Sequence, residues 1–164
     1  RALGLARMLQ PSSIGPLGFG TSVRASNGST ALPGAFSITN FFARNPEEVA
    51  LIKESGRKIA MDMLSMPGFI SFVSVVVGDC LMTITAWETR ESMAPLMKQG
   101  EHRSMVSRYF TSEFGQGGMT GVWVPGRLNA RRVRCAGCDK MTPVEAPQQT
   151  CSCGAVLPDP LAYW

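Results

Sequence analysis

Four of the five cysteines in this 164-residue sequence lie in two closely spaced pairs near its C-terminal end. The first pair is Cys135-x2-Cys138 and the second is Cys151-x-Cys153. A CxxC turn presents two thiolates to one point, and structural zinc sites use four such ligands in a tetrahedron. The twelve residues between the pairs can form a short β-hairpin that returns the second pair to the first. The pattern predicts a zinc ribbon whose metal is structural, because all four ligand positions are filled by protein.

Two alternatives to zinc stay open for these cysteines. Four thiolates also suit iron in a rubredoxin-like site, and two of the thiols can form a disulfide. Clustered pairs without a recognisable secretory signal favour metal ligands over a disulfide framework. Cys80 stands alone in an apolar, strand-like run and is expected to be a buried small apolar residue.

The residues before the ribbon predict an α+β domain. Alternating or β-branched residues predict strands, and Gly78-Asp79 predicts a hairpin between two of them. One helix is predicted to start with Asn45 as its N-cap, followed by Pro46 and by Glu48 at the third helical position. The predicted strands are 35–42, 69–77, 80–87 and 119–124, and the predicted helices are 46–66 and 91–112, the second with Gly100 as a candidate interruption. This β-α-β-β-α-β order is ferredoxin-like, and the sheet face without helices needs a cover, commonly a second copy of the domain.

Three regions follow from composition: an N-terminal arm over 1–33, the α+β domain over 34–126, and the ribbon over 127–164 with a basic linker and an aromatic tail. The first 46 residues contain four arginines and no acid, and glycines and prolines interrupt the arm. We expect it to be extended and to contact another chain. Its composition resembles an organellar transit peptide, and Val23-Arg24-Ala25-Ser26 resembles a cleavage site. An ordinary disordered arm is the alternative.

Four short segments carry a family resemblance: Ile38-Thr39-Asn40-Phe41, Met66-Pro67-Gly68-Phe69, Thr85-Ala86-Trp87-Glu88 and Glu101-His102-Arg103. With them, residues 35–126 resemble the antibiotic-biosynthesis-monooxygenase-like family of dimeric α+β barrels. The resemblance implies a ferredoxin-like barrel domain that can dimerise with itself. For family members that oxidise aromatic substrates without a cofactor, it also implies that Asn40, Trp87 and His102 lie near a substrate cavity. Heme cleavage is not expected, because the predicted second helix lacks the Trp that heme-degrading relatives pair with a helical His.

Two functions from different classes remain. The favoured expectation is a non-catalytic accessory subunit that docks on protein subunits of a large organellar assembly. A photosynthetic complex is the first candidate for this assembly and a respiratory complex the second. That reading places the chain in the chloroplast, associated with thylakoids, ahead of the mitochondrion. The alternative is a small cofactor-independent monooxygenase acting on an aromatic or quinol-like substrate through Asn40, Trp87 and His102.

The sequence also limits the partners. No run of eighteen apolar residues exists, so no membrane-spanning segment is predicted, while a membrane-peripheral position stays open. A basic run of four arginines, Arg127, Arg131, Arg132 and Arg134, precedes the first cysteine pair. Without interleaved aromatic residues, this run does not predict nucleic-acid binding.

Overall fold

A computed structural model describes residues 17–18, 22–98 and 100–160 of the chain. The chain divides into two compact units, with the boundary between Val124 and Pro125. The first unit is a mixed α+β domain, and the second contains the cysteine cluster. No helix in these described ranges is both long and apolar enough to cross a membrane.

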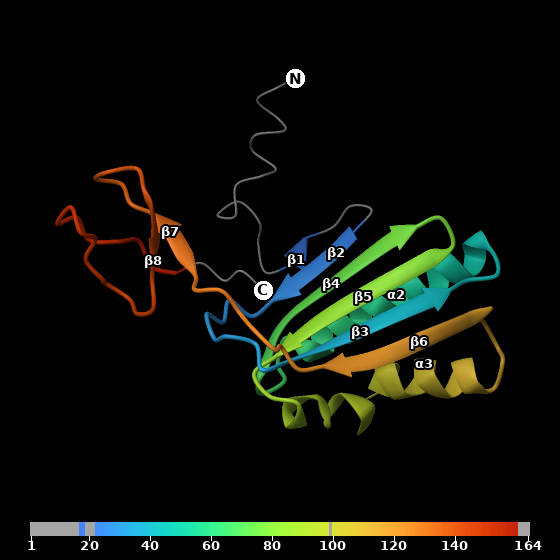
Figure 1. Cartoon of the computed structure of the whole chain (residues 1–164). Coiled ribbons are helices and arrows are strands. Elements are labelled where there is room, and N and C mark those ends of the chain that lie inside the picture. The colour runs from blue at the N-terminus through green and yellow to red at the C-terminus, as the bar shows by residue number, and fades with distance from the viewer. Residues whose placement is uncertain (1–16, 19–21, 99, 161–164) are drawn as a thin grey trace, which may run out of the picture. The chain divides into compact units, whose positions relative to one another are not determined.

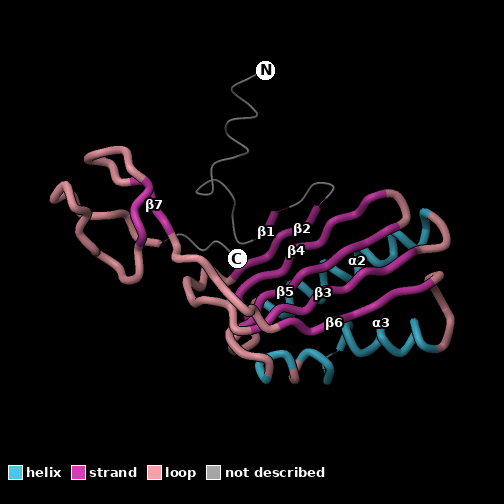
Figure 2. The backbone as a smooth tube through the Cα atoms, in the orientation of Figure 1, coloured by secondary structure: helices cyan, strands magenta, loops and turns pink. Residues whose placement is uncertain are grey.

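The first unit is built on one antiparallel sheet with the strand order β1-β2-β4-β5-β3-β6 (Figure 1, Figure 2). The central β3–β6 part has the β-α-β-β-α-β order that the sequence predicts. Its elements, in chain order, are β1 (Leu17–Gly18), β2 (Ser22–Ser26), β3 (Ala35–Phe42), α2 (Pro46–Met63), β4 (Phe69–Val77), β5 (Cys80–Trp87), two 3-10 turns (Glu91–Met93 and Leu96–Lys98), α3 (Gly100–Phe110) and β6 (Gly117–Trp123).

Local sequence signals explain where several of these elements begin and end. The Asn45 side chain accepts a hydrogen bond from the Glu48 backbone N–H at 2.9 Å, so the predicted N-cap of α2 is confirmed. Gly78 joins β4 to β5 with a φ of 62°, a conformation that glycine adopts without steric cost. The hairpin predicted at Gly78-Asp79 is therefore also confirmed.

The two faces of the sheet differ in what covers them. The rings of Trp87 and Phe69 pack edge to face, with their centroids 5.4 Å apart. Both residues belong to one buried cluster with Met63 of α2. Phe41 contacts Tyr109 of α3 on that same face. Because side chains alternate along a strand, Asn40 and the other even-numbered residues of β3 lie on the opposite face. In Figure 1, α2 lies behind the sheet. We call the two faces the helix-covered face and the open face.

The structure corrects three sequence expectations in this unit. The predicted helix over 91–112 is instead two 3-10 turns followed by α3, with the break next to Gly100. The first helix ends at Met63, before the predicted Met66. The arm was expected to be extended and to contact another chain, yet its residues 22–26 form β2, which pairs with β4. For residues 1–16 and 19–21 of the arm, this expectation lies outside the described residues. Strand addition satisfies the backbone groups of the β4 edge, which the sequence pattern alone did not reveal.

The second unit is small and is organised around the cysteines. Strands β7 (Arg132–Arg134) and β8 (Met141–Pro143) form an antiparallel hairpin. Its buried cluster contains Val133, Val144 and Leu157 beside two of the cysteines. The predicted hairpin is present but lies around the first cysteine pair, rather than between the two pairs. A single bridge from Thr150 to Val156 encloses the second pair.

Candidate metal centre and the helix-covered face

The Sγ atoms of the four clustered cysteines all lie within 4.8 Å of one another, and this cluster can hold a metal ion. Cys135 and Cys153 have their sulfurs 3.6 Å apart, and Cys138 and Cys151 have theirs 3.7 Å apart. A disulfide requires about 2.05 Å between sulfurs. A tetrahedron with metal–sulfur distances of about 2.3 Å has edges of about 3.8 Å. The observed spacing therefore matches ligands around one ion and excludes a bonded pair in this structure.

Backbone turns aim the thiols at one point. In the first turn, the Asp139 N–H donates to the Cys135 carbonyl at 2.9 Å, which closes the loop around Cys138. In the second turn, the Gly154 N–H donates to the Cys151 carbonyl at 2.9 Å, and Gly154 has a φ of 90°. The short CxC spacing is thus accommodated by a glycine in the left-handed region immediately after Cys153.

Hydrogen bonds, burial and the neighbouring thiols shift the pKa of two of these cysteines. The backbone N–H of Cys153, followed by the Thr142 hydroxyl, lowers the pKa of the Cys151 thiol to about 6. At Cys138 the backbone N–H of Lys140 also lowers the pKa of the thiol. Burial and the three neighbouring thiols together have a larger, opposite effect and raise this pKa to about 11. One thiolate therefore forms readily, whereas further negative charge in the cluster needs a cation to offset it.

Gly137 leaves room for the sulfur cluster. A Cβ atom at this position would lie 2.8 Å from the Cβ of Ala155 and 3.3 Å from the Sγ of Cys153. Any side chain would therefore displace the second cysteine turn. Gly137 was not predicted from the sequence, although its position inside the CxxC turn is a signal for a residue without a side chain.

The three residues of the alternative catalytic hypothesis are not brought together. Trp87 is fully buried in the core, and its Nε1 donates to Thr85 Oγ1 at 2.8 Å. Asn40 lies on the open face, on the opposite side of the sheet from Trp87. His102 lies on α3, whose buried Met105 and ring-stacked Tyr109 mark the side that packs on the helix-covered face.

His102 nevertheless has an unusual environment. Its Nδ1 atom is buried and has no hydrogen-bond partner among the described residues. Burial lowers the pKa of the imidazole, and the Leu96 carbonyl opposes that shift only partly. His102 is therefore held neutral, with a free lone pair inside the domain.

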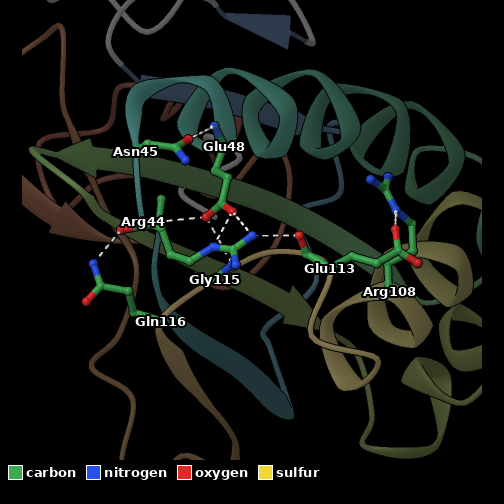
Figure 3. Close-up of polar contacts among 8 residues, drawn as sticks. Arg44, Asn45, Glu48, Arg108, Glu113, Gly115 and Gln116 are labelled. Atoms are coloured by element: carbon green, nitrogen blue, oxygen red, sulfur yellow. Dashed lines mark hydrogen bonds and ion pairs between the residues drawn. The ribbon is translucent and has the colours of Figure 1, made fainter.

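Sequence reasoning missed a polar cluster at the start of α2, which Figure 3 shows in close-up. Glu48 is buried and accepts from the Arg44 backbone N–H at 2.8 Å, from Arg44 Nε at 2.6 Å and from the Gly115 backbone N–H at 3.0 Å. Arg44 also donates to the carbonyl of Glu113 at 2.6 Å. This cluster joins the β3–α2 corner to the loop between α3 and β6, so its role is structural.

Comparison with known proteins identifies solved structures of similar fold. SnoaB, a cofactor-independent oxygenase from Streptomyces nogalater, is 10% identical, with a TM-score of 0.48 over 59% of this chain and 97% of that one. A putative antibiotic biosynthesis monooxygenase from Nitrosomonas europaea is 12% identical, with a TM-score of 0.47 over 57% and 99%. Rv0793 from Mycobacterium tuberculosis is 13% identical, with a TM-score of 0.49 over 57% and 96%.

The ferredoxin-like fold that the resemblance implied is present in the element order and sheet of the first unit, and these solved structures are similar to it. At these identities the likeness concerns the fold and not the activity. No protein-family model and no curated protein matches the sequence.

These results correct the favoured functional expectation, a non-catalytic accessory subunit of an organellar assembly. Two of the three structures reported above are named as an oxygenase and as a putative monooxygenase, which favours the alternative expectation. The expectation also relied on an arm that docks on a neighbour, whereas residues 22–26 of that arm pair with β4 of their own domain. It is therefore wrong, and no finding bears on the chloroplast localisation that accompanied it.

Proposed function

We propose that the second unit is a zinc ribbon in which Cys135, Cys138, Cys151 and Cys153 bind one structural zinc ion. The observation that carries the proposal is the set of four sulfurs within 4.8 Å of one another, with two pairs spaced as on a tetrahedron. A unit this small buries little apolar surface, so a metal supplies stability that its core does not. The all-thiolate ligand set suits zinc, with iron in the same geometry as the alternative.

Cysteine variants of the full chain test this proposal. Cys138→Ala removes one ligand and should abolish stoichiometric zinc binding, whereas Cys80→Ala is the matched control because Cys80 lies outside the cluster, on β5. Elemental analysis after purification under reducing conditions measures the zinc content of each. Equal zinc in Cys138→Ala and in the unaltered chain would refute the assignment.

A second candidate function, cofactor-independent oxidation of an aromatic or quinol-like substrate, is favoured by His102. Its neutral, buried Nδ1 has no partner and can accept a proton from a phenolic substrate. The helix-covered face carries strand hydroxyls, including those of Thr39 and Thr120, whose Oγ1 atoms lie 2.9 Å apart. Of the residues first considered for this activity, only His102 keeps a proposed catalytic role.

Oxygen uptake with an aromatic or quinol-like substrate tests this second function. His102→Ala should abolish uptake, and Asn40→Ala should leave it unchanged, since Asn40 lies on the other face of the sheet. If the unaltered chain consumes no oxygen with such substrates, or if His102→Ala retains full activity, the oxidation hypothesis is contradicted.

We also propose that a second copy of the chain covers the open face. Exposed apolar side chains gather there on four strands: Val75, Val77, Met82, Phe42, Met119 and Trp123. Cα pairing places Val75 beside Met82, and Met82 beside Asn40, so these side chains form one continuous surface. A continuous apolar face of this kind is usual at subunit interfaces and rare on free surfaces. Arg24 of β2 is the one charged residue among the described strand positions of this face, so little charge is present to select a different partner, which favours self-association.

A further inference from the structure

Asn27 follows the last residue of β2, and its side chain ties that end of the strand to β4. Its Nδ2 donates to the backbone carbonyl of Phe69, the first residue of β4, at 2.6 Å. Its Oδ1 accepts from the Ser29 backbone N–H at 2.9 Å. Both ends of the amide are therefore engaged, even though Asn27 is exposed to solvent.

The residue after Asn27 makes this amide chemically labile. Asparagine is thermolabile, and a following glycine leaves the next backbone nitrogen unhindered for attack on the Asn Cγ. Gly28 is exposed with a backbone φ of 79°, and a Cβ there would meet nothing within 4 Å, so the space beside its Cα is open. In the folded chain, however, the Gly28 N–H donates to Ser26 Oγ at 3.2 Å.

The reaction is a deamidation that consumes only water. The Gly28 nitrogen loses its proton and bonds to the Asn27 Cγ, while Nδ2 takes up a proton and leaves as ammonia. Water then opens the cyclic imide at one of its two carbonyls, which leaves either an aspartate or an isoaspartate at position 27. Neither product retains the N–H that donates to the Phe69 carbonyl. The aspartate places a carboxylate near that carbonyl oxygen, which repels it, and the isoaspartate lengthens the main chain by one methylene group.

We propose that Asn27 is a deamidation site whose modification releases β2 from β4 irreversibly. Attack requires the Gly28 N–H to leave Ser26 and the Asn27 amide to leave Phe69, so the reaction proceeds from a state in which this end of β2 has opened. Once formed, the carboxylate cannot remake the bond that closes the strand. The modified chain then exposes the backbone edge of β4 that β2 otherwise pairs with.

Peptide mass spectrometry of the full chain, incubated folded at neutral pH, tests the site. The peptide containing Asn27 should gain the mass that replacing NH2 by OH produces, and an isoaspartyl methyltransferase should label it. The peptide containing Asn129, which precedes alanine, is the internal control and should remain unmodified. If Asn27 reacts in unfolded protein but is unchanged in folded protein, the end of β2 does not open and the proposal fails.

Hydrogen exchange tests the consequence. Asn27→Asp should raise the exchange rate of amides in β2, while Asn129→Asp should leave it unchanged. Unaltered exchange in Asn27→Asp would overturn the release of β2. If Asn27→Asp does not fold, the same measurement on the deamidated fraction of the unaltered chain decides between the two results.

Discussion

At the residue scale, Glu48 shows how a helix-start signal can acquire a second role. Its position three residues after Asn45 predicts a capping residue, and its backbone N–H does bond to Asn45. Its carboxylate, however, bonds to the backbone of Arg44 and to that of Gly115, which lies 67 residues away in the chain. Spacing along one helix cannot predict the second contact, because it depends on where the α3–β6 loop lies in the folded domain.

The Glu48 contacts predict a specific acid sensitivity. The Arg44 side chain foremost, with backbone donors at Arg44 and Gly115, lowers the pKa of Glu48 from 4.5 to about 2, despite the opposing effect of burial. A carboxyl with a lowered pKa in the folded state stabilises it fully above the unfolded pKa, and this contribution is lost as pH falls from 4.5 toward 2. Glu48→Gln should therefore lower the Tm at pH 7, and the difference from the unaltered chain should shrink below pH 4.5.

Glu47→Gln is the matched control for this prediction, because Glu47 is exposed in the same helical turn. Thermal unfolding of the three proteins between pH 7 and pH 3 measures the effect. An equal Tm for Glu48→Gln and Glu47→Gln at neutral pH would contradict the structural role of Glu48.

Gly137 provides a second prediction at this scale. In Gly137→Ala, the new Cβ must displace Ala155 or the Cys153 sulfur, so we expect zinc affinity to fall on the order of tenfold. Gly126→Ala is the control, because a Cβ there meets nothing within 4 Å. Competition with a chromophoric chelator measures both, and equal affinities would show that the cysteine turns tolerate the methyl group.

At the scale of elements, sequence patterns predicted the central strands of the sheet. They did not predict the strand that forms only by pairing with a distant part of the chain. Strands β3, β4 and β5 occupy the predicted ranges, since alternation and a Gly-Asp turn are local signals. The four cysteines were found by spacing alone and lie together. Strand β2 was missed because Ser22–Ser26 is short and polar, and it is a strand only because it pairs with β4. Asn40 and His102 were grouped as one site, but the pleat places Asn40 on the open face, which the residue types do not reveal.

The pairing of β2 predicts what truncation does. Deleting residues 1–28 removes Val23 and Ala25 from the buried cluster around Trp87, and we expect a loss of about 2–3 kcal/mol of unfolding free energy. Deleting residues 1–16 leaves β2 in place and should cost much less. Denaturant unfolding measures both. If the two truncated proteins are equally stable, β2 does not contribute to the fold.

At the scale of the whole molecule, the open face predicts an oligomeric state. Val75→Lys combined with Met82→Lys places two charges on adjacent, partly exposed positions of that face, and should convert a dimer into a monomer. Met61→Lys is the control, because Met61 is exposed on α2. Light scattering after gel filtration gives the masses, and an unaltered chain that is monomeric at micromolar concentration would contradict self-association.

The four-thiolate metal site is the central claim, and X-ray absorption at the metal edge of the purified full chain tests it most directly. The account predicts one zinc ion per chain with four sulfur neighbours at about 2.3 Å and no nitrogen or oxygen ligand. The cysteine spacing and the sulfur positions both favour this result. A protein purified under reducing conditions that contains no metal, or whose ion has fewer than four sulfur ligands, would contradict it.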